Sequence, residues 1–184
     1  PDTYDDETVT FPDFDSISIE GEDEDVTVET DFDIDSSTAK NNHQITNLTI
    51  VDEAGTPAID VTSENAQSEF DNLNITSNDV GINVKTSGND VNVINVTDSN
   101  INVSDGTKGI VLATDGGNPD DRDGFVIDTV DIDGPGIDED SSVGIDLSGV
   151  EKPGKDGLPV NLTVTGSDVD DFETQVTLSD DLDM

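Results

Sequence analysis

Oxygen-bearing side chains gather in one glycine-rich stretch near the middle of the chain, residues 115–124 (DGGNPDDRDG). Hard cations such as Ca²⁺ prefer carboxylate and amide oxygens, and a glycine-rich loop can wrap these around an ion. The stretch lacks the EF-hand spacing, which places oxygens at positions 1, 3 and 5 before a glycine. Two interpretations stay open, a site for Ca²⁺ or another cation and a solvated acidic loop. The candidate ligands are Asp115, Asn118, Asp120, Asp121 and Asp123.

Groups for acid–base or nucleophilic catalysis are scarce. The chain has six basic residues, of which Arg122 is the only arginine, and its one histidine, His43, lies in the polar stretch NNHQ. Because Asp and Glu number 45, a pair of neighbouring carboxylates arises by chance and does not by itself indicate a dyad. We expect the bases to form surface ion pairs and His43 to be a solvated turn residue. The sequence therefore predicts no enzyme, no catalytic residue and no required cofactor.

Five Asn-x-Ser/Thr sequons, none with proline in the middle, are acceptors for N-linked glycans. Four have the form Asn-Leu/Ile/Val-Thr, in which the asparagine belongs to a short β-like segment. A glycan cannot enter a core, so these asparagines must point outward and their apolar neighbours inward. We therefore expect an extracellular glycoprotein modified at two or more of Asn47, Asn74, Asn95, Asn102 and Asn161.

The formal net charge of −39 limits both the environment and the partners. Low hydrophobicity with high net charge is first of all a disorder signature, but the apolar residues here are periodic. At molar salt the Debye length falls to about 3 Å, so repulsion between surface acids is largely screened. Many Asp, few Lys and a Val/Ile-rich apolar set resemble the proteins of halophilic archaea.

The negative charge opposes binding to nucleic acid or an anionic membrane, and we expect no membrane insertion. A calcium buffer or a nucleic-acid mimic is the rival explanation of the acidity.

A quartet of small residue, Ile, any residue and Val or Leu recurs along the chain. It occupies residues 58–61, 81–84, 109–112 and 144–147, with a degenerate copy at 175–178. A second short β-like segment precedes each quartet, at 47–50, 74–76, 95–97, 130–132 and 161–164. A repeating unit of two strands and turns of unequal length is typical of stacked rungs, each too small to close a core alone.

This pattern, over residues 41–178, resembles the right-handed β-helix domains of the pectin-lyase-like superfamily, without a catalytic signature. The resemblance implies an all-β, right-handed parallel β-helix of about five rungs. A β-sandwich is the structural alternative, because turn signals every 8 to 12 residues suit it as well. The residues predicted to form the repeat core are Ile59, Val61, Ile82, Val84, Ile110, Leu112, Ile145 and Leu147.

Residues 1–40 are predicted to form an acidic N-terminal strand arm or cap, and residues 41–184 the β-helix domain. Alternating segments in the arm suggest that it adds as a strand to a neighbouring subunit or caps its own body. The residues predicted for self-association are Val9, Phe11, Ile17 and Ile19.

Together these patterns favour a structural or adhesive surface glycoprotein of a halophilic archaeon, located outside the cell and assembling into a homo-oligomer or filament. Two alternatives stay open. One is a carbohydrate-binding or carbohydrate-cleaving β-helix domain, with surface glycans as partners. It is disfavoured because Phe70, Phe125 and Phe172 are the only aromatic residues of the repeat body. The other is a virion spike.

Overall fold

The chain is a parallel β-helix. The computed structural model describes residues 9–12, 16–22, 26–36, 41–53, 55–63, 66–87, 93–104, 108–115, 124–137, 141–150 and 161–178. Over these ranges the regular secondary structure is β-strand, and the strands form two sheets in which neighbours run parallel. No described segment is a helix long and apolar enough to cross a membrane. A β-helix was predicted, and the sandwich alternative, which requires antiparallel strands, is wrong.

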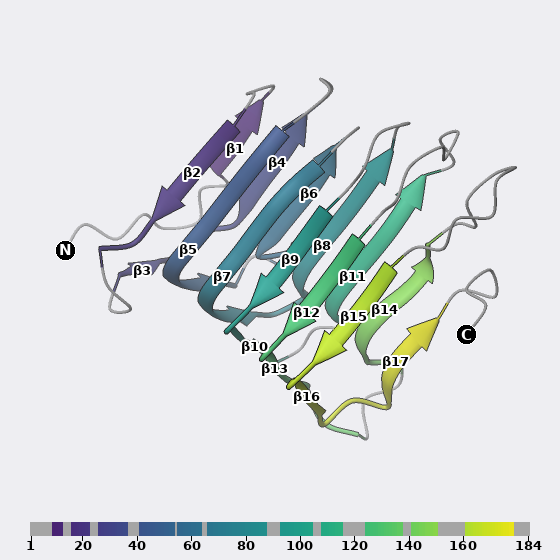
Figure 1. Cartoon of the computed structure of the whole chain (residues 1–184). Helices are drawn as coiled ribbons and strands as arrows, with labels where there is room; N and C mark the ends of the chain where they lie inside the picture. The colour runs from purple at the N-terminus through teal and green to yellow at the C-terminus, as the bar shows by residue number, and fades with distance from the viewer. Residues whose placement is uncertain are drawn as a thin grey trace, which may run out of the picture.

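One sheet, which we call face 1, contains seven strands in the order of the chain (Figure 1). Its strands are β1 (Val9–Pro12), β4 (Phe32–Ser36), β6 (Ile59–Ser63), β8 (Val80–Ser87), β11 (Lys108–Asp115), β14 (Val143–Gly149) and β17 (Thr174–Leu178). Seven strands stack here, so the prediction of about five rungs was slightly inaccurate. The reason is that β1 and β4, from the acidic N-terminal segment, pair in the same parallel register as the later strands.

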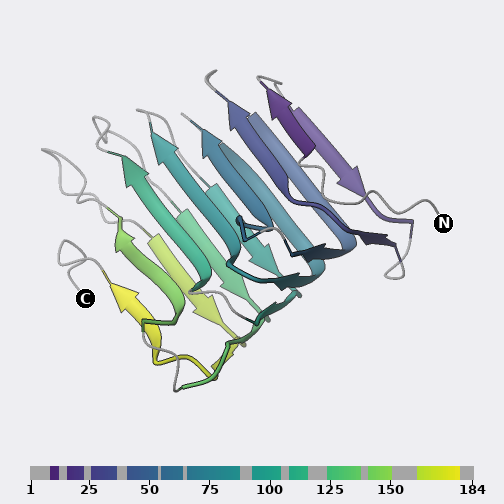
Figure 2. The same ribbon diagram turned by 180° about the vertical axis from the view of Figure 1, so that it is seen from behind.

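The second sheet bends along its length and supplies two further faces, as Figure 2 shows from behind. Its strands are β2 (Ser16–Glu20), β3 (Thr27–Val28), β5 (Asn41–Asp52), β7 (Ala66–Ser77), β9 (Val93–Thr97), β10 (Asn100–Val103), β12 (Gly124–Asp128), β13 (Asp131–Asp133), β15 (Asn161–Thr165) and β16 (Asp168–Asp170). The long strands β5 and β7 cross the bend. Face 2 consists of β2, β9, β12, β15 and the first halves of β5 and β7. Face 3 consists of β3, β10, β13, β16 and the second halves.

A left-handed backbone residue marks the corner between faces 2 and 3 in successive rungs. Asn47, Asn72, Asp98, Thr129 and Gly166 all have φ between 46° and 62°. Asn, Asp and Gly tolerate this conformation better than most residues, whereas a β-branched residue such as Thr129 is strained in it. The corner is the reason that a strand of 12 residues can serve two faces.

Successive rungs place their apolar residues in columns along the interior. The eight residues predicted to form the repeat core are all buried, with exposed fractions of 1% or less. They lie on face 1 and pack against the apolar columns of faces 2 and 3. The sequence prediction of the core on face 1 is therefore confirmed, and period-2 alternation was sufficient to make it.

The N-terminal segment predicted as an arm or cap pairs with the body of its own chain. Strands β2 and β3 both pair with β5, and β1 pairs with β4. Ile17 is 9% exposed and belongs to the same core as the later rungs. These strands lie at one end of the stack, with β17 at the other (Figure 1).

The small residue of the repeated quartet is explained by packing between faces. Gly81, Gly109 and Gly144 occupy the same position on successive strands of face 1. A Cβ on Gly109 would lie 2.4 Å from Cγ2 of Ile132 and 2.6 Å from the carbonyl oxygen of Gly144. Neither separation is tolerable, so the isoleucine column of face 3 requires glycine here.

We expect Gly109→Ala to lower the free energy of unfolding by about 1–3 kcal/mol, because the added methyl group overpacks the interior. Gly124→Ala is the matched control, since a Cβ there meets no atom within 4 Å and the residue has no positive φ. It should be neutral or stabilising by up to about 1 kcal/mol. Chemical unfolding midpoints in molar salt measure both effects. Equal values for the two variants would contradict the packing argument.

Candidate functional site

Acids and neutral hydrogen-bond donors alternate along one outward-facing column of the β-helix. The column on face 2 next to the corner consists of Glu20, Thr46, Asp71, Thr97, Asp128 and Thr165. In it, the Thr97 hydroxyl donates to Asp71 Oδ1 and the Thr165 hydroxyl to Asp128 Oδ1, each at 2.5 Å. Neighbouring strands lie about 4.8 Å apart, so this order keeps one carboxylate from facing another across that distance.

Single acid–donor pairs occur in other columns. Gln44 Nε2 donates to Glu69 Oε2 at 2.7 Å, and Asn83 Nδ2 donates to Asp60 Oδ1 at 2.9 Å. Charge-assisted hydrogen bonds of this kind are stronger than neutral ones. Several acids on the outer surface are therefore held by a neutral donor of a neighbouring rung.

Among the described strands, acids pair with acids at two places, at Asp33 and Asp60 on β4 and β6 of face 1 and at β13 and β16 of face 3. Asp131 pairs with Asp168, and Asp133 with Asp170, which gives a two-by-two group of carboxylates that we call the acidic array. Repulsion from Asp168, with a contribution from burial and from the other nearby acids, raises the pKa of Asp170. The acidic array is the place where this surface most needs positive counterions.

A groove of about 660 Å³ runs over face 3 beside the acidic array. It is lined by Asn74, Thr76, Asn100, Asn102, Asp131, Asp133, Asp170 and Asp171. Its lining offers amides, hydroxyls and carboxylates. Such a surface can collect hydrated cations or hydrogen-bond to the hydroxyl groups of a sugar.

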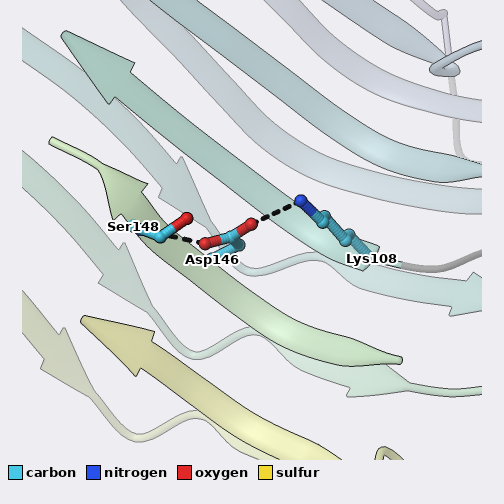
Figure 3. Close-up of polar contacts among 3 residues, drawn as sticks. All are labelled: Lys108, Asp146 and Ser148. Atoms are coloured by element: carbon cyan, nitrogen blue, oxygen red, sulfur yellow. Dashed lines mark hydrogen bonds and ion pairs between the residues drawn. The ribbon is translucent and has the colours of Figure 1, made fainter. Parts of the chain in front are cut away.

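One partly buried ion pair crosses face 1 (Figure 3). Lys108 Nζ lies 2.5 Å from Asp146 Oδ2, and the Ser148 amide donates to Asp146 Oδ1 at 2.9 Å. Burial by itself raises the pKa of Asp146, but the bonds from Lys108 and Ser148 outweigh it and leave the pKa below its usual value. The pair satisfies a carboxylate that is only 6% exposed and holds β11 to β14.

The sequon asparagines occupy unequal positions. Asn74 and Asn102 are exposed on face 3, and their neighbours Leu73, Ile75, Ile101 and Val103 are buried, as the sequence predicted. Asn95 is half-buried on face 2. Asn47 lies at a corner, where its Oδ1 accepts a hydrogen bond from Asn72 Nδ2 at 2.8 Å. Asn161 begins β15, but its side chain is outside the described residues.

Most of the predicted cation loop also lies outside the described residues, namely Asn118, Asp120, Asp121 and Asp123. Asp115 is the last residue of β11, and its side chain is not described. Elsewhere, in the part of the chain that the structure describes, no three His, Cys, Asp or Glu side chains converge closely enough to hold a metal ion. The cation-site prediction therefore stays a prediction.

The prediction for His43 was wrong. Instead of a solvated turn residue, His43 is a core residue of β5, 1% exposed, in the interior column between Ile17 and Ser68. Among the described residues, neither ring nitrogen nor the Ser68 hydroxyl has a hydrogen-bond partner. Burial lowers the pKa of His43. The polar flanks of the NNHQ stretch concealed an alternating strand whose inward position the histidine occupies.

We expect His43→Leu to raise stability and to remove a pH dependence near neutrality. A depressed pKa in the folded state means that the unfolded chain binds the proton more readily. The free energy of unfolding therefore has its full value above the pKa of histidine in the unfolded chain, about 6.5, where His43 is neutral in both states. It decreases as the pH drops below that pKa. The nearby acids Glu20 and Glu69 are exposed and occur in both proteins. Unfolding midpoints at pH 7.5 and 5.5 in molar salt give the comparison, and an equal pH shift in both proteins would contradict this role.

Reasoning from sequence missed three of these features, the acid–donor alternation, the buried His43–Ser68 pair and the Lys108–Asp146 ion pair. Only the acid–donor alternation had a signal in the sequence, because aligning the repeats rung by rung brings Asp71, Thr97 and Asp128 into one column.

Comparisons with protein-family models, curated proteins and solved structures found no match. The chemistry of the surface therefore carries the functional argument.

Proposed function

We propose that this protein is a structural or adhesive module on the outside of a salt-adapted cell, such as a halophilic archaeon. The observation that carries the proposal is the pairing of outward acids with neutral donors, which alternate fully in the face 2 column from Glu20 to Thr165. It provides a strongly acidic, highly solvated surface while the acids themselves join successive rungs. Such a surface suits a protein that stays soluble and folded in molar salt.

The exposed sequons on face 3 support an extracellular location. Asn74 and Asn102 are exposed on strands whose neighbouring side chains face the core, so a glycan on either projects into solvent. Asn47 is instead half-buried at a corner beside Asn72, so a glycan on its Nδ2 would have less open space around it. We therefore favour Asn74 and Asn102 as the modified residues.

A carbohydrate-binding role is the second candidate, and the face 3 groove favours it. The groove of about 660 Å³ offers amide and carboxylate groups suited to sugar hydroxyls. Among its lining residues there is no aromatic side chain on which a sugar ring could stack. Binding would then rest on hydrogen bonds alone, so we rank this role second.

Fractionation of the source cells tests the proposed function. The protein should be recovered with the cell envelope or the medium, and its intact mass should exceed the polypeptide mass by one or more glycans. Peptide mapping should place these glycans on Asn74 or Asn102. Recovery from the cytoplasm at the unmodified mass would overturn the proposal. A soluble oligosaccharide that protects the groove carboxylates from carbodiimide modification would favour the second candidate instead.

A further inference from the structure

The last rung exposes apolar side chains at positions that are buried in the rungs between it and the first rung. Val164 and Val176 are 44% and 45% exposed. Their column neighbours in the preceding rung, Ile127 and Ile145, are 1% and 0% exposed. Leu162, Val169 and Leu178 are only partly buried at the same end. The interior of the β-helix is therefore open at this end of the described chain.

In the part of the chain that the structure describes, the strands at both ends of the stack pair along one edge. Among the described strands, β15, β16 and β17 pair only with the preceding rung, and β1, β2 and β3 only with the following one. Unpaired N–H and C=O groups of an edge strand are a template for another chain. Since the strands of each face all run in parallel, the two ends are complementary in direction.

The register places apolar residues opposite each other if the first rung of a second copy follows the last rung. Val164 belongs to the interior column that begins with Ile19, and Leu162 to the column that begins with Ile17. On face 3, Val169 belongs to the column that begins with Val28. On face 1, the column that ends at Val176 begins at the register position of Val9.

Three of the outward columns would also join favourably, whereas the column that ends at Asp170 would continue to the register position of Glu29. The alternating column on face 2 begins with Glu20 and ends with Thr165, so a second copy continues the order of acid and hydroxyl without interruption. In the neighbouring column Thr163 would follow onto Ser18. On face 3, Asp168 would meet Thr27, so none of these three contacts joins two acids.

From this complementarity we propose that β15, β16 and β17 of one copy bind the edges of β2, β3 and β1 of a second copy, head to tail. The inference deepens the proposed structural function and rests on it. Such a contact does not close on itself, so repetition generates a filament whose strands continue from one copy to the next. The residues predicted from sequence for self-association, Val9, Phe11, Ile17 and Ile19, all lie in β1 and β2 of this interface.

Two variants with matched charge test the interface. Val176→Asp places a carboxylate on the exposed end, where the side chain is accessible enough for the monomer to fold. Ile137→Asp adds the same charge at an apolar residue that is 69% exposed outside the proposed contact. In molar salt, the wild type and Ile137→Asp should form assemblies that lengthen with concentration. Val176→Asp should remain monomeric, with an unchanged circular dichroism spectrum. Sedimentation velocity and electron microscopy give the sizes.

Mixing distinguishes a head-to-tail contact from any other. Val176→Asp keeps an intact first rung, so it should cap growing assemblies and shorten those of the wild type in proportion to its share of the mixture. A wild type that stays monomeric at its highest soluble concentration would overturn the inference, as would assembly by Val176→Asp or a failure of this variant to shorten the wild type. These outcomes concern assembly alone, whereas the cell fractionation tests the proposed function independently.

Discussion

Ile110→Asp is expected to lower the free energy of unfolding by about 5 kcal/mol or more, which is enough to unfold a domain of ordinary stability. Ile110 is 0% exposed and is paired on both sides, with Ile82 and with Ile145. The substitution removes apolar contacts and leaves a carboxylate in the interior without a partner. Circular dichroism in molar salt should show loss of the β-sheet signal or a strongly reduced unfolding midpoint.

The control for this variant is Val126→Asp. Val126 lies on β12 between Asn95 and Thr163, in an outward column whose neighbours are neutral. A carboxylate there fits the acid–donor alternation of the surface, so the change in stability should stay within about 1 kcal/mol. If the two variants were equally stable, the assignment of inward and outward positions would be wrong.

Dialysis from molar to low salt is expected to unfold the protein cooperatively. Spread over the 9462 Å² surface, the 39 net charges have roughly 240 Å² each and lie about 15 Å apart, so screening decides their repulsion. The acidic array should suffer most, because neighbouring strands bring its carboxylates within about 5 Å of each other. The β-sheet signal should be complete in about 3 M salt and lost near 0.1 M. A native spectrum at low salt would remove the argument for salt adaptation.

Two double variants with equal net charge locate the effect. Asp168→Asn with Asp170→Asn relieves the acidic array and should move the unfolding transition to lower salt. Asp71→Asn with Asp128→Asn removes the same number of charges, but these carboxylates accept hydrogen bonds from Thr97 and Thr165. The second double variant should gain little or lose stability. If both pairs shifted the transition equally, total charge and not column order would govern salt dependence.

The strands and their inward faces followed from the sequence because alternation is a local property. The quartet that contains Ile82 and Val84 shows a period of two within four residues, and stacking adds depth without changing which side chains point inward. The same local reasoning failed for His43. Its neighbours are polar, so nothing nearby indicated burial, and only pairing with β2 and β7 places it in the core.

By itself, the sequence determined the all-β class, the repeat, the buried face of each quartet and the outward direction of Asn74 and Asn102. These follow from backbone periodicity and from the exclusion of glycans and charges from a core. The tertiary structure alone decided the register, since residues 22 to 37 positions apart become neighbours only when rungs stack. This register brings the Thr165 hydroxyl to Asp128 as a donor and places Asp131 beside Asp168. It also packs Ile132 against position 109, which therefore requires glycine. It also leaves Val176 uncovered at the end of the stack, because no described strand follows β17.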